Sequence, residues 1–328
     1  MKKILNYLFE HKYLTQQDAK EVLVNIANGK YNESEIAAFM TVYIMRNITI
    51  DELKGFREAL LDLCVKIDLS DYNTIDLCGT GGDEKNTFNI STLASFIVAG
   101  AGYKVAKHGN YSVSSSCGSS NVLEYYGYKF TNNESTLRKS IEEAGICFLH
   151  APLFHPAMKN VAPVRKMLRV KTFFNILGPM VNPSFPKRQI IGVFNLELAR
   201  LYAYLYQQLD KDFLIIHSLD GYDEISLTSD FKVFSKDTEQ ILSPEHLGMK
   251  TINQDQIYGG STVEESAKIF IDILEGKGTE AQNNVVIANA AMAIKCSDNN
   301  KSFTDCIEEA RESLLSNKAM LSFKKLIG

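Results

Sequence analysis

The chain has 328 residues, 45% of them hydrophobic and 23% charged, so it can bury a substantial core and is not expected to be disordered. Its net charge of −4 and pI of about 5.9 argue against a nucleic-acid surface, because such surfaces are usually basic. There is no Cys-x-x-Cys pair among the six cysteines, no secretory signal, and no apolar run near the roughly 20 residues of a membrane helix. We expect a cytoplasmic protein with reduced thiols that binds neither membrane nor nucleic acid.

Residues 1–68 are predicted to form a small helical domain. Thr49 and Glu52 have the spacing of a capping box before an apolar segment, which is typical of a helix N-terminus. No strand pattern interrupts this region, so its apolar helix faces are expected to cover a core or a partner subunit. Six of the seven prolines lie between residues 152 and 186, which indicates connecting and functional loops there. Part of residues 155–186 is expected to join the helical domain.

From Asn73 onward strands alternate with helices, which indicates an α/β domain over residues 69–328 with a central, mostly parallel sheet. Strands are predicted at residues 73–78, 104–107, 146–149 and 213–216. Helices are predicted at residues 93–102, 122–126, 134–144, 261–274, 281–295 and 304–324. Residues 225–234 alternate between apolar and polar side chains, and they are predicted to add antiparallel strands.

The segment Asp76–Thr92 joins a predicted strand to a buried helix through a turn that contains Gly79, Gly81 and Gly82. Glycine permits positive φ and lets backbone N–H groups approach a ligand closely. The helix is expected to begin near Asn89, where unpaired N–H groups and partial positive charge favour an anion. The segment matches neither the dinucleotide-binding fingerprint nor the nucleoside-triphosphate loop. We interpret it as a phosphate cradle; the alternative is a tight strand-to-helix turn that binds nothing.

Two later segments add groups that bind anions. Lys107–Asn110 combines a cation, an imidazole, a flexible glycine and an amide directly after a predicted strand. The serine-rich run 114–120 leads into a helix, where hydroxyl and N–H groups meet. This run is a second predicted place for phosphate oxygens, and its alternative is a solvated flexible loop.

Asp223 and Glu224 are adjacent carboxylates on a turn that follows a buried strand. Such a pair suits a hard cation, since Mg²⁺ typically binds through one or two carboxylates together with substrate phosphates. The alternative is an acidic turn on the surface. His155 and Arg165 are candidates to face an acidic substrate, because an arginine can hold a carboxylate through two hydrogen bonds. Their alternatives are a loop histidine and a surface charge.

Six motifs in chain order resemble those of the anthranilate phosphoribosyltransferase family. They are Gly79-Thr-Gly-Gly-Asp83, Asn89-Ile-Ser-Thr92, Lys107-His-Gly-Asn110, His155-Pro-Ala-Met158 followed by Arg165, Phe174-Asn-Ile-Leu-Gly-Pro179, and Asp223-Glu-Ile-Ser226. The match extends across nearly the whole chain. The resemblance implies a small helical domain on a larger α/β domain of the nucleoside phosphorylase and phosphoribosyltransferase type, usually in a homodimer formed through the helical part.

The resemblance also implies a reaction and a set of site residues. The reaction transfers the phosphoribosyl group of phosphoribosyl pyrophosphate to anthranilate, with Mg²⁺, and gives N-(5-phosphoribosyl)anthranilate and pyrophosphate in tryptophan biosynthesis. The residues implied to bind phosphoribosyl pyrophosphate are Gly79, Gly82, Asp83, Thr87, Asn89, Ser91, Thr92, Lys107, Ser115 and Ser119. Those implied to bind anthranilate are Gly79, His108, Asn110, Arg165 and Gly178, and those implied to bind metal are Ser91, Asp223 and Glu224. No residue is assigned as a general base, because a neutral aromatic amine is already nucleophilic.

The sequence departs from the family pattern at a few positions. Tyr111 stands where family members often have arginine after Lys-His-Gly-Asn, and Asn121 ends a Ser-Gly-Ser-Ala-Asp pattern that here loses its acid. A Leu-Gly-x-Arg-Thr segment appears with Arg169 and Lys171 in place of its glycine and arginine. These departures bear on the ribose and anthranilate contacts, whereas the cradle and the acidic pair are intact.

Two alternative functions are considered. A pyrimidine nucleoside phosphorylase of the same fold also breaks a ribose C1 bond, but that family has a Lys-His-Ser-x-Gly-Gly type of phosphate loop and generally a longer chain. A non-enzymatic relative that binds nucleic acid is the second alternative. The acidic balance of the chain and the retained Asp223 and Glu224 argue against it.

Overall fold

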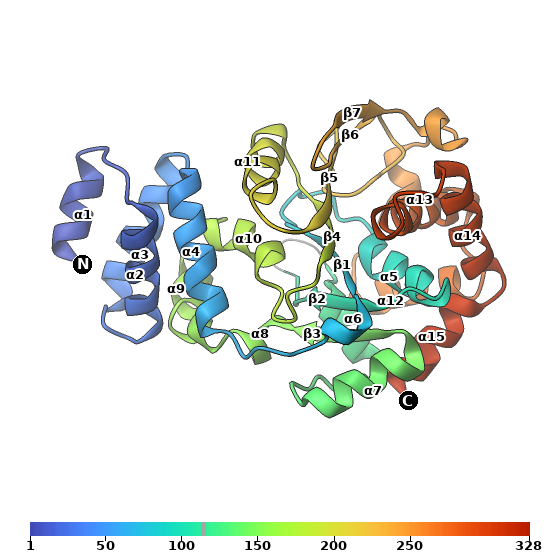
Figure 1. Cartoon of the computed structure of the whole chain (residues 1–328), viewed down its shortest axis with the longest axis horizontal. Helices are drawn as coiled ribbons and strands as arrows, with labels where there is room; N and C mark the ends of the chain where they lie inside the picture. The colour runs from blue at the N-terminus through green and yellow to red at the C-terminus, as the bar shows by residue number, and fades with distance from the viewer. Residues whose placement is uncertain (113–115) are drawn as a thin grey trace. The chain divides into compact units, whose positions relative to one another are not determined.

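The computed structural model describes residues 1–112 and 116–328, and the chain divides between two units (Figure 1). The first unit comprises Met1–Ile67 and Ala151–Phe185 and is helical. The second comprises Asp68–His150 and Pro186–Gly328 and contains the sheet. The proline-rich segment therefore returns to the unit in which the chain begins.

The helical unit is organised around a cluster of aromatic rings. Its helices are α1 (Lys2–Phe9), α2 (Gln16–Ala27), α3 (Glu33–Met45), α4 (Ile50–Leu63), α8 (Ala151–Phe154), α9 (Ala162–Leu168) and α10 (Phe173–Leu177). Thr49 and Glu52 form the predicted capping box at the start of α4. The ring of Phe56 on this helix stacks on Phe173, with centroids 4.6 Å apart, and meets Phe39 edge-on. The cluster therefore fastens the returning segment to the N-terminal helices.

The second unit has one seven-stranded sheet in the order β3-β2-β1-β4-β5-β6-β7. Its strands are β1 (Ile75–Gly79), β2 (Val105–Gly109), β3 (Ile146–His150), β4 (Arg188–Gly192), β5 (Asp212–Ser218), β6 (Phe231–Phe234) and β7 (Glu239–Leu242). The first five strands are parallel to one another. Strand β6 pairs antiparallel with β5, and β7 pairs antiparallel with β6. The chain builds outward from β1 through β2 to β3, and then resumes on the other side of β1 with β4.

Helices cover both faces of this sheet. They are α5 (Ile90–Gly100), α6 (Ser119–Tyr125), α7 (Glu134–Ala144), α11 (Leu196–Tyr206), α12 (Val263–Leu274), α13 (Glu280–Ser297), α14 (Phe303–Leu315) and α15 (Lys318–Ile327). Alternate residues of β1 explain the two faces, since Ile75 and Leu77 join the apolar core that contains α5 and α13. Asp76 points to the other face, where Gln189 donates to its Oδ2 (3.1 Å) and Tyr206 of α11 donates to Gln189 Oε1 (2.8 Å). Figure 1 shows α11 on the opposite side of the strands from α5 and α13.

Two of the predicted elements are wrong in part. Only Phe231–Phe234 of residues 225–234 forms a strand, because the preceding residues make a loop in which Leu227 has a φ of 59°. The predicted helix over residues 304–324 is two helices, α14 and α15, separated at Asn317, whose φ of 63° is left-handed. A left-handed residue ends an α-helix, and asparagine tolerates this conformation better than most residues.

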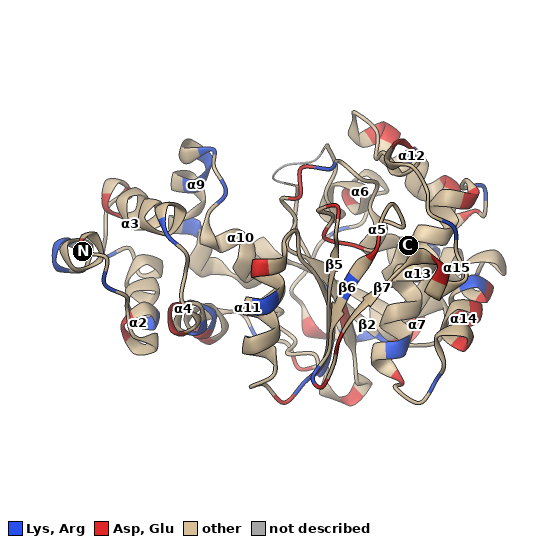
Figure 2. Ribbon diagram, turned by 90° about the horizontal axis from the view of Figure 1, so that it is seen from above, with Lys and Arg blue, Asp and Glu red and all other residues tan. Residues whose placement is uncertain are grey.

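Basic and acidic residues are both spread along the described parts of the chain. Figure 2 shows lysine, arginine and acidic residues interspersed along the elements of each unit. Within the described ranges no helix combines the length and the apolar character needed to cross a membrane.

Candidate active site

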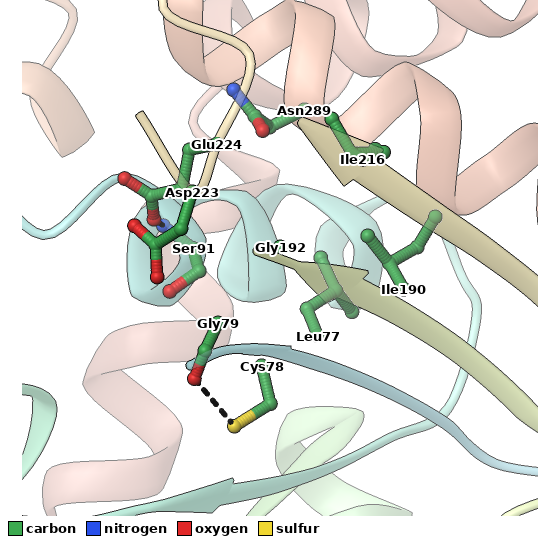
Figure 3. A pocket seen from close by; sticks show the side chains of 10 residues that line it. All are labelled: Leu77, Cys78, Gly79, Ser91, Ile190, Gly192, Ile216, Asp223, Glu224 and Asn289. Atoms are coloured by element: carbon green, nitrogen blue, oxygen red, sulfur yellow. Dashed lines mark hydrogen bonds between the residues drawn. The ribbon is translucent and has the colours of Figure 1, made fainter. Parts of the chain in front are cut away.

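The site lies where the connections from neighbouring parallel strands leave in opposite directions. The connection after β1 leads to β2 on one side, and β4 lies on the other side of β1. In α/β sheets, ligands bind outside the carboxyl ends of the strands at such a point. Here a small cavity of about 20 Å³ is lined by Leu77, Cys78, Gly79, Ser91, Ile190, Gly192, Ile216, Asp223, Glu224 and Asn289 (Figure 3). The structure therefore brings Gly79, Ser91 and the acidic pair together.

The turn after β1 has the backbone conformation expected of an anion-binding loop. Gly81 and Gly82 have φ values of 62° and 80°, and Glu84 and Asn86 are also left-handed, at 62° and 47°. Left-handed residues other than glycine are uncommon and gather at functional sites. The loop is anchored at its far end, where Asn86 Nδ2 donates to Gly260 O (2.9 Å) and Gly259 N donates to Asn86 O (2.8 Å).

Asp223 and Glu224 reach this turn from the loop after β5 and hold its backbone. Asp223 Oδ2 accepts a hydrogen bond from Gly81 N (2.7 Å), and Glu224 Oε1 accepts one from Ser91 N (2.8 Å). Ser91 is in the first turn of α5, whose N-cap Asn89 makes no side-chain cap. The carboxyl oxygen of Glu224 therefore accepts the hydrogen bond that a side-chain cap would accept at this end of the helix.

Burial raises the pKa of each of the three acidic residues, and neighbouring charges add to the effect at Asp223 and Glu224. Burial, and then the charge of Asp83, raises the pKa of Asp223 to about 7. Removal from bulk water, followed by the charges of Asp223 and Asp83, raises the pKa of Glu224 to about 8, and burial raises that of Asp83. The positive charge of Lys107 acts in the opposite direction on Glu224. A cation bound among these groups would favour their ionised forms.

Lys107 and His108 are held at the end of β2 by buried contacts. The Lys107 side chain is 2% exposed, and its Nζ donates to Leu77 O (2.7 Å) on β1. The His108 backbone N donates to Asp76 Oδ1 (3.1 Å). These contacts fix the cation beside the strand that leads into the glycine turn.

The other predicted residues of this unit are placed as follows. Ser119 is the first residue of α6, and its Oγ donates to the carbonyl oxygen of the exposed Asn110 (3.2 Å). Thr87 forms an isolated antiparallel bridge with Tyr258. Thr92 is buried in α5, at 1% exposure. Ser115 lies outside the described residues.

Arg165, Gly178 and His155 belong to the helical unit. Arg165 on α9 donates through Nη2 to Asn175 Oδ1 (3.2 Å), and its guanidinium lies 5.8 Å from the ring centroid of Phe174. Burial lowers the pKa of Arg165 and lowers that of His155 to about 4. Gly178 follows α10, and a Cβ placed on it would meet no atom within 4 Å.

Residues that sequence reasoning missed also shape the site. Gly192, at the end of β4, pairs in register with Gly79. A Cβ on Gly192 would lie 1.5 Å from the carbonyl oxygen of Asp223, and one on Gly79 would lie 2.5 Å from Asp223 Oδ2. Asn289 of α13 bonds to the backbone beside Glu224. Gly192 was missed because the strand that it ends was not predicted, and Asn289 was missed because it stands in a largely apolar helix with no motif around it.

Comparisons with known proteins agree with this geometry. Residues 71–320 match the family model of the glycosyl transferase family, a/b domain, and residues 2–64 match that of the glycosyl transferase family, helical bundle domain. The chain is 65% identical over 326 residues to the anthranilate phosphoribosyltransferase of Flavobacterium psychrophilum, covering 99% of this chain and 98% of that protein.

Two solved structures are also similar to this chain. The crystal structure of anthranilate phosphoribosyltransferase from Thermus thermophilus matches with a TM-score of 0.91 at 30% identity, covering 98% of both chains. The enzyme of that name from Saccharomyces cerevisiae, in complex with PRPP and Mg, matches with a TM-score of 0.87 at 28% identity, covering 96% of this chain and 93% of that one.

This chain belongs to the anthranilate phosphoribosyltransferase family. It is an enzyme that transfers the phosphoribosyl group of phosphoribosyl pyrophosphate to anthranilate in tryptophan biosynthesis. The predicted family and the predicted fold class, a helical domain with a mostly parallel α/β domain, are confirmed. Membership of the anthranilate phosphoribosyltransferase family decides against the nucleoside phosphorylase and the nucleic-acid-binding relative.

Gly192→Ala is expected to inactivate this anthranilate phosphoribosyltransferase by displacing Asp223. The new Cβ would overlap the Asp223 carbonyl oxygen, and a displacement of about 1 Å at a site can lower the rate by about 100-fold. Gly248→Ala is the control, because Gly248 is left-handed (φ 66°) but has open space around its Cβ position. The control should lose about 1–2 kcal/mol of stability and keep its turnover. Steady-state rates and urea unfolding test both variants, and equal turnover in the two would contradict the steric argument.

Proposed function

We propose that the glycine turn, the Lys107 segment and the acidic pair carry out this transfer by holding phosphoribosyl pyrophosphate together with Mg²⁺. The observation that carries the proposal is the pairing of Asp223 with Gly81 N and of Glu224 with Ser91 N. It joins the carboxylates to the two backbone segments expected to hold phosphate oxygens. The proposed binding residues are Gly79, Gly82, Asp83, Thr87, Asn89, Ser91, Thr92, Lys107, Ser115 and Ser119.

Polar atoms beside the turn fit a bound substrate. Among the described residues, the buried Oγ1 of Thr80 and Oδ1 of Asn89 have no hydrogen-bond partner. A buried polar atom left in this state costs about 1–3 kcal/mol, so ribose or phosphate groups that bonded to them would recover part of that free energy. The Asn89 oxygen accepts hydrogen bonds and therefore suits a ribose hydroxyl.

The donor set fits Mg²⁺ that arrives with its substrate. No group of three or more His, Cys, Asp or Glu side chains arranged to hold a metal is found in the part of the chain that the structure describes. Mg²⁺ commonly binds through one or two carboxylates, waters and substrate phosphates. We assign Asp223, Glu224 and the Ser91 hydroxyl as its protein ligands.

The mechanism follows from where charge develops. The anthranilate amine attacks the anomeric carbon as pyrophosphate leaves, so negative charge builds on the leaving group. Lys107 and the glycine turn are proposed to stabilise that charge, and preorganised donors are often the largest catalytic contribution. Mg²⁺, when bound, supplies further positive charge at the pyrophosphate. Gly79, His108, Asn110, Arg165 and Gly178 are proposed to position anthranilate, and no residue is assigned as a base.

Removing the metal or its ligands should abolish the reaction. Anthranilate fluorescence should fall only when protein, Mg²⁺ and phosphoribosyl pyrophosphate are all present, and a chelator should stop the decay. The double variant Asp223→Ala, Glu224→Ala should show no decay, because both proposed carboxylate ligands are lost. Circular dichroism is the control for folding. A folded double variant that turned over at the original rate would refute the metal assignment.

Arg165→Ala should raise the Michaelis constant for anthranilate by about tenfold or more, because a charged hydrogen bond contributes about 1.5–3 kcal/mol. The constant for phosphoribosyl pyrophosphate should change little, since Arg165 is assigned to the acidic aromatic substrate. Lys166→Ala is the matched control, a neighbouring cation of α9 that is exposed. An effect confined to phosphoribosyl pyrophosphate would show that Arg165 is assigned to the wrong substrate.

We propose that the enzyme is a homodimer formed through its helical unit. Phe9, Tyr13 and Met45 of this unit are 59%, 54% and 83% exposed. A contiguous exposed apolar patch is typical of a protein interface, and these side chains are proposed to lie in one. Light scattering should give twice the 36.7 kDa of one chain, and Met45→Asp should lower that mass. A wild-type protein that stayed at the mass of one chain at micromolar concentration would contradict the proposal.

We also propose a cytoplasmic location. Its support is that all six cysteines are free, as expected in a reducing compartment. Recovery of the active enzyme only from a secreted or membrane fraction would contradict this location.

A further inference from the structure

Asn289 occupies an unusual position in the middle of α13. Its neighbours along the helix, from Val285 to Ile294, are otherwise apolar or small and buried. Asparagine is a poor residue for a helix interior, because its side chain competes for backbone hydrogen bonds. A buried amide must also find partners. The presence of an asparagine at position 289 is therefore explained by the hydrogen bonds of its amide.

The Asn289 amide grips both polar groups of one residue in the acidic loop. Oδ1 accepts from Ile225 N (3.1 Å), and Nδ2 donates to Ile225 O (2.9 Å). Nδ2 also donates to Val285 O (2.8 Å), one turn back in its own helix. The side chain thus pairs with Ile225 much as a neighbouring strand would, and it fixes the residue that directly follows Glu224.

Two further hydrogen bonds hold Glu224 itself. Ser218 Oγ donates to Glu224 O (2.6 Å), while Glu224 Oε1 accepts from Ser91 N (2.8 Å). With Ile225 held by Asn289, Glu224 is fastened through its side chain, through its own carbonyl and through the residue that follows it. Asn289 and Glu224 both line the cavity in Figure 3.

We propose that Asn289 is a positioning residue that sets the acidic pair for Mg²⁺ and thereby controls the affinity of the site for the metal. This inference rests on the proposed assignment of Asp223 and Glu224 as metal ligands. Groups that orient metal ligands typically change metal affinity or activity by about 10–100-fold when they are removed. A bond that merely filled the core would change stability and leave metal affinity unaltered.

The test uses two substitutions that separate the bonds of Asn289. Asn289→Ser removes both bonds to Ile225 but retains a hydroxyl that can bond to the carbonyl of Val285, as serines in helices do. Asn289→Ala removes all three bonds. The readouts are the dissociation constant of Mn²⁺, measured by electron paramagnetic resonance with phosphoribosyl pyrophosphate present, and the Mg²⁺ dependence of turnover.

Both variants should weaken Mn²⁺ binding and raise the Mg²⁺ concentration for half-maximal rate by about tenfold or more. The Michaelis constant for anthranilate should change by less than about twofold, which corresponds to roughly 0.4 kcal/mol. The matched control is Ser313→Ala, which deletes a buried bond to Ile97 O (2.7 Å) between α14 and α5. It should lower the thermal midpoint without altering either metal readout.

Several outcomes would overturn the inference. Wild-type Mn²⁺ affinity in folded Asn289→Ser would show that the Ile225 bonds do not set the metal site, and if Asn289→Ala does not fold, Asn289→Ser alone decides. If the Asn289 variants lowered the thermal midpoint but changed the Mn²⁺ dissociation constant no more than Ser313→Ala does, the role of Asn289 would be limited to stability. The double variant Asp223→Ala, Glu224→Ala separates the two proposals. If it binds Mn²⁺ normally, the metal assignment fails and this inference fails with it; if it loses Mn²⁺ while Asn289→Ser does not, only this inference fails.

Discussion

The site depends on one close approach, that of the Asp223 peptide to the ends of β1 and β4. Gly79 and Gly192 face each other in register there, and a Cβ on either would collide with Asp223. Because β5 is the next strand beyond β4, the loop that follows it can cross the end of β4 and reach the turn after β1. The absence of two methyl groups therefore lets three separate segments meet at one point, and every contact of the acidic pair with the cradle follows from it.

This approach concentrates negative charge. The pKa values of Asp223 and Glu224, raised to about 7 and 8, mean that both carboxyls bind protons more tightly in the folded chain than in the unfolded chain. Folding stability therefore falls as the pH rises from the ordinary carboxyl range near 4 toward 8. The N–H groups of Gly81 and Ser91 offset part of this cost. A cluster that opposes folding at neutral pH is explained by ligand binding, since a bound dication would attract the same carboxylates that repel one another.

The sequence predicted the elements whose signals are local and missed those set by distant contacts. Thr49 with Glu52, and the segment Glu134–Ala144, carry their own caps or apolar spacing, and the structure has both helices there. The strand β4 was missed, because Arg188–Gly192 follows a proline-rich stretch and is held as a strand by its pairing with β1 and β5. Residues 225–230 alternate like a strand, yet the amide of Asn289 takes both polar groups of Ile225 that a neighbouring strand would pair. The motifs included Gly79, Ser91 and the acidic pair, which line one cavity, but the hydrogen bond of Glu224 to the start of α5 joins residues 133 positions apart and could not be predicted from the motifs.

The structure shows the contacts or the backbone conformation at Tyr111, Asn121 and Arg169, three positions that depart from the family pattern. Tyr111 lies edge-on to the ring of His150, with centroids 5.0 Å apart, and His150 Nδ1 also bonds to Oγ of Ser120 (2.9 Å), the residue before Asn121. Asn121 keeps a structural role without its charge, because its Oδ1 accepts from Gly118 N (2.9 Å) and Ser112 N (3.2 Å), as a carboxylate oxygen would. Arg169 adopts the left-handed conformation (φ 54°) that a glycine in the family pattern would adopt more easily. Asn121 thus keeps a hydrogen-bonding role, and the bonds of Asp223 and Glu224 to the cradle involve none of the replaced residues. These substitutions therefore leave unchanged the glycines and backbone N–H groups that contact Asp223 and Glu224.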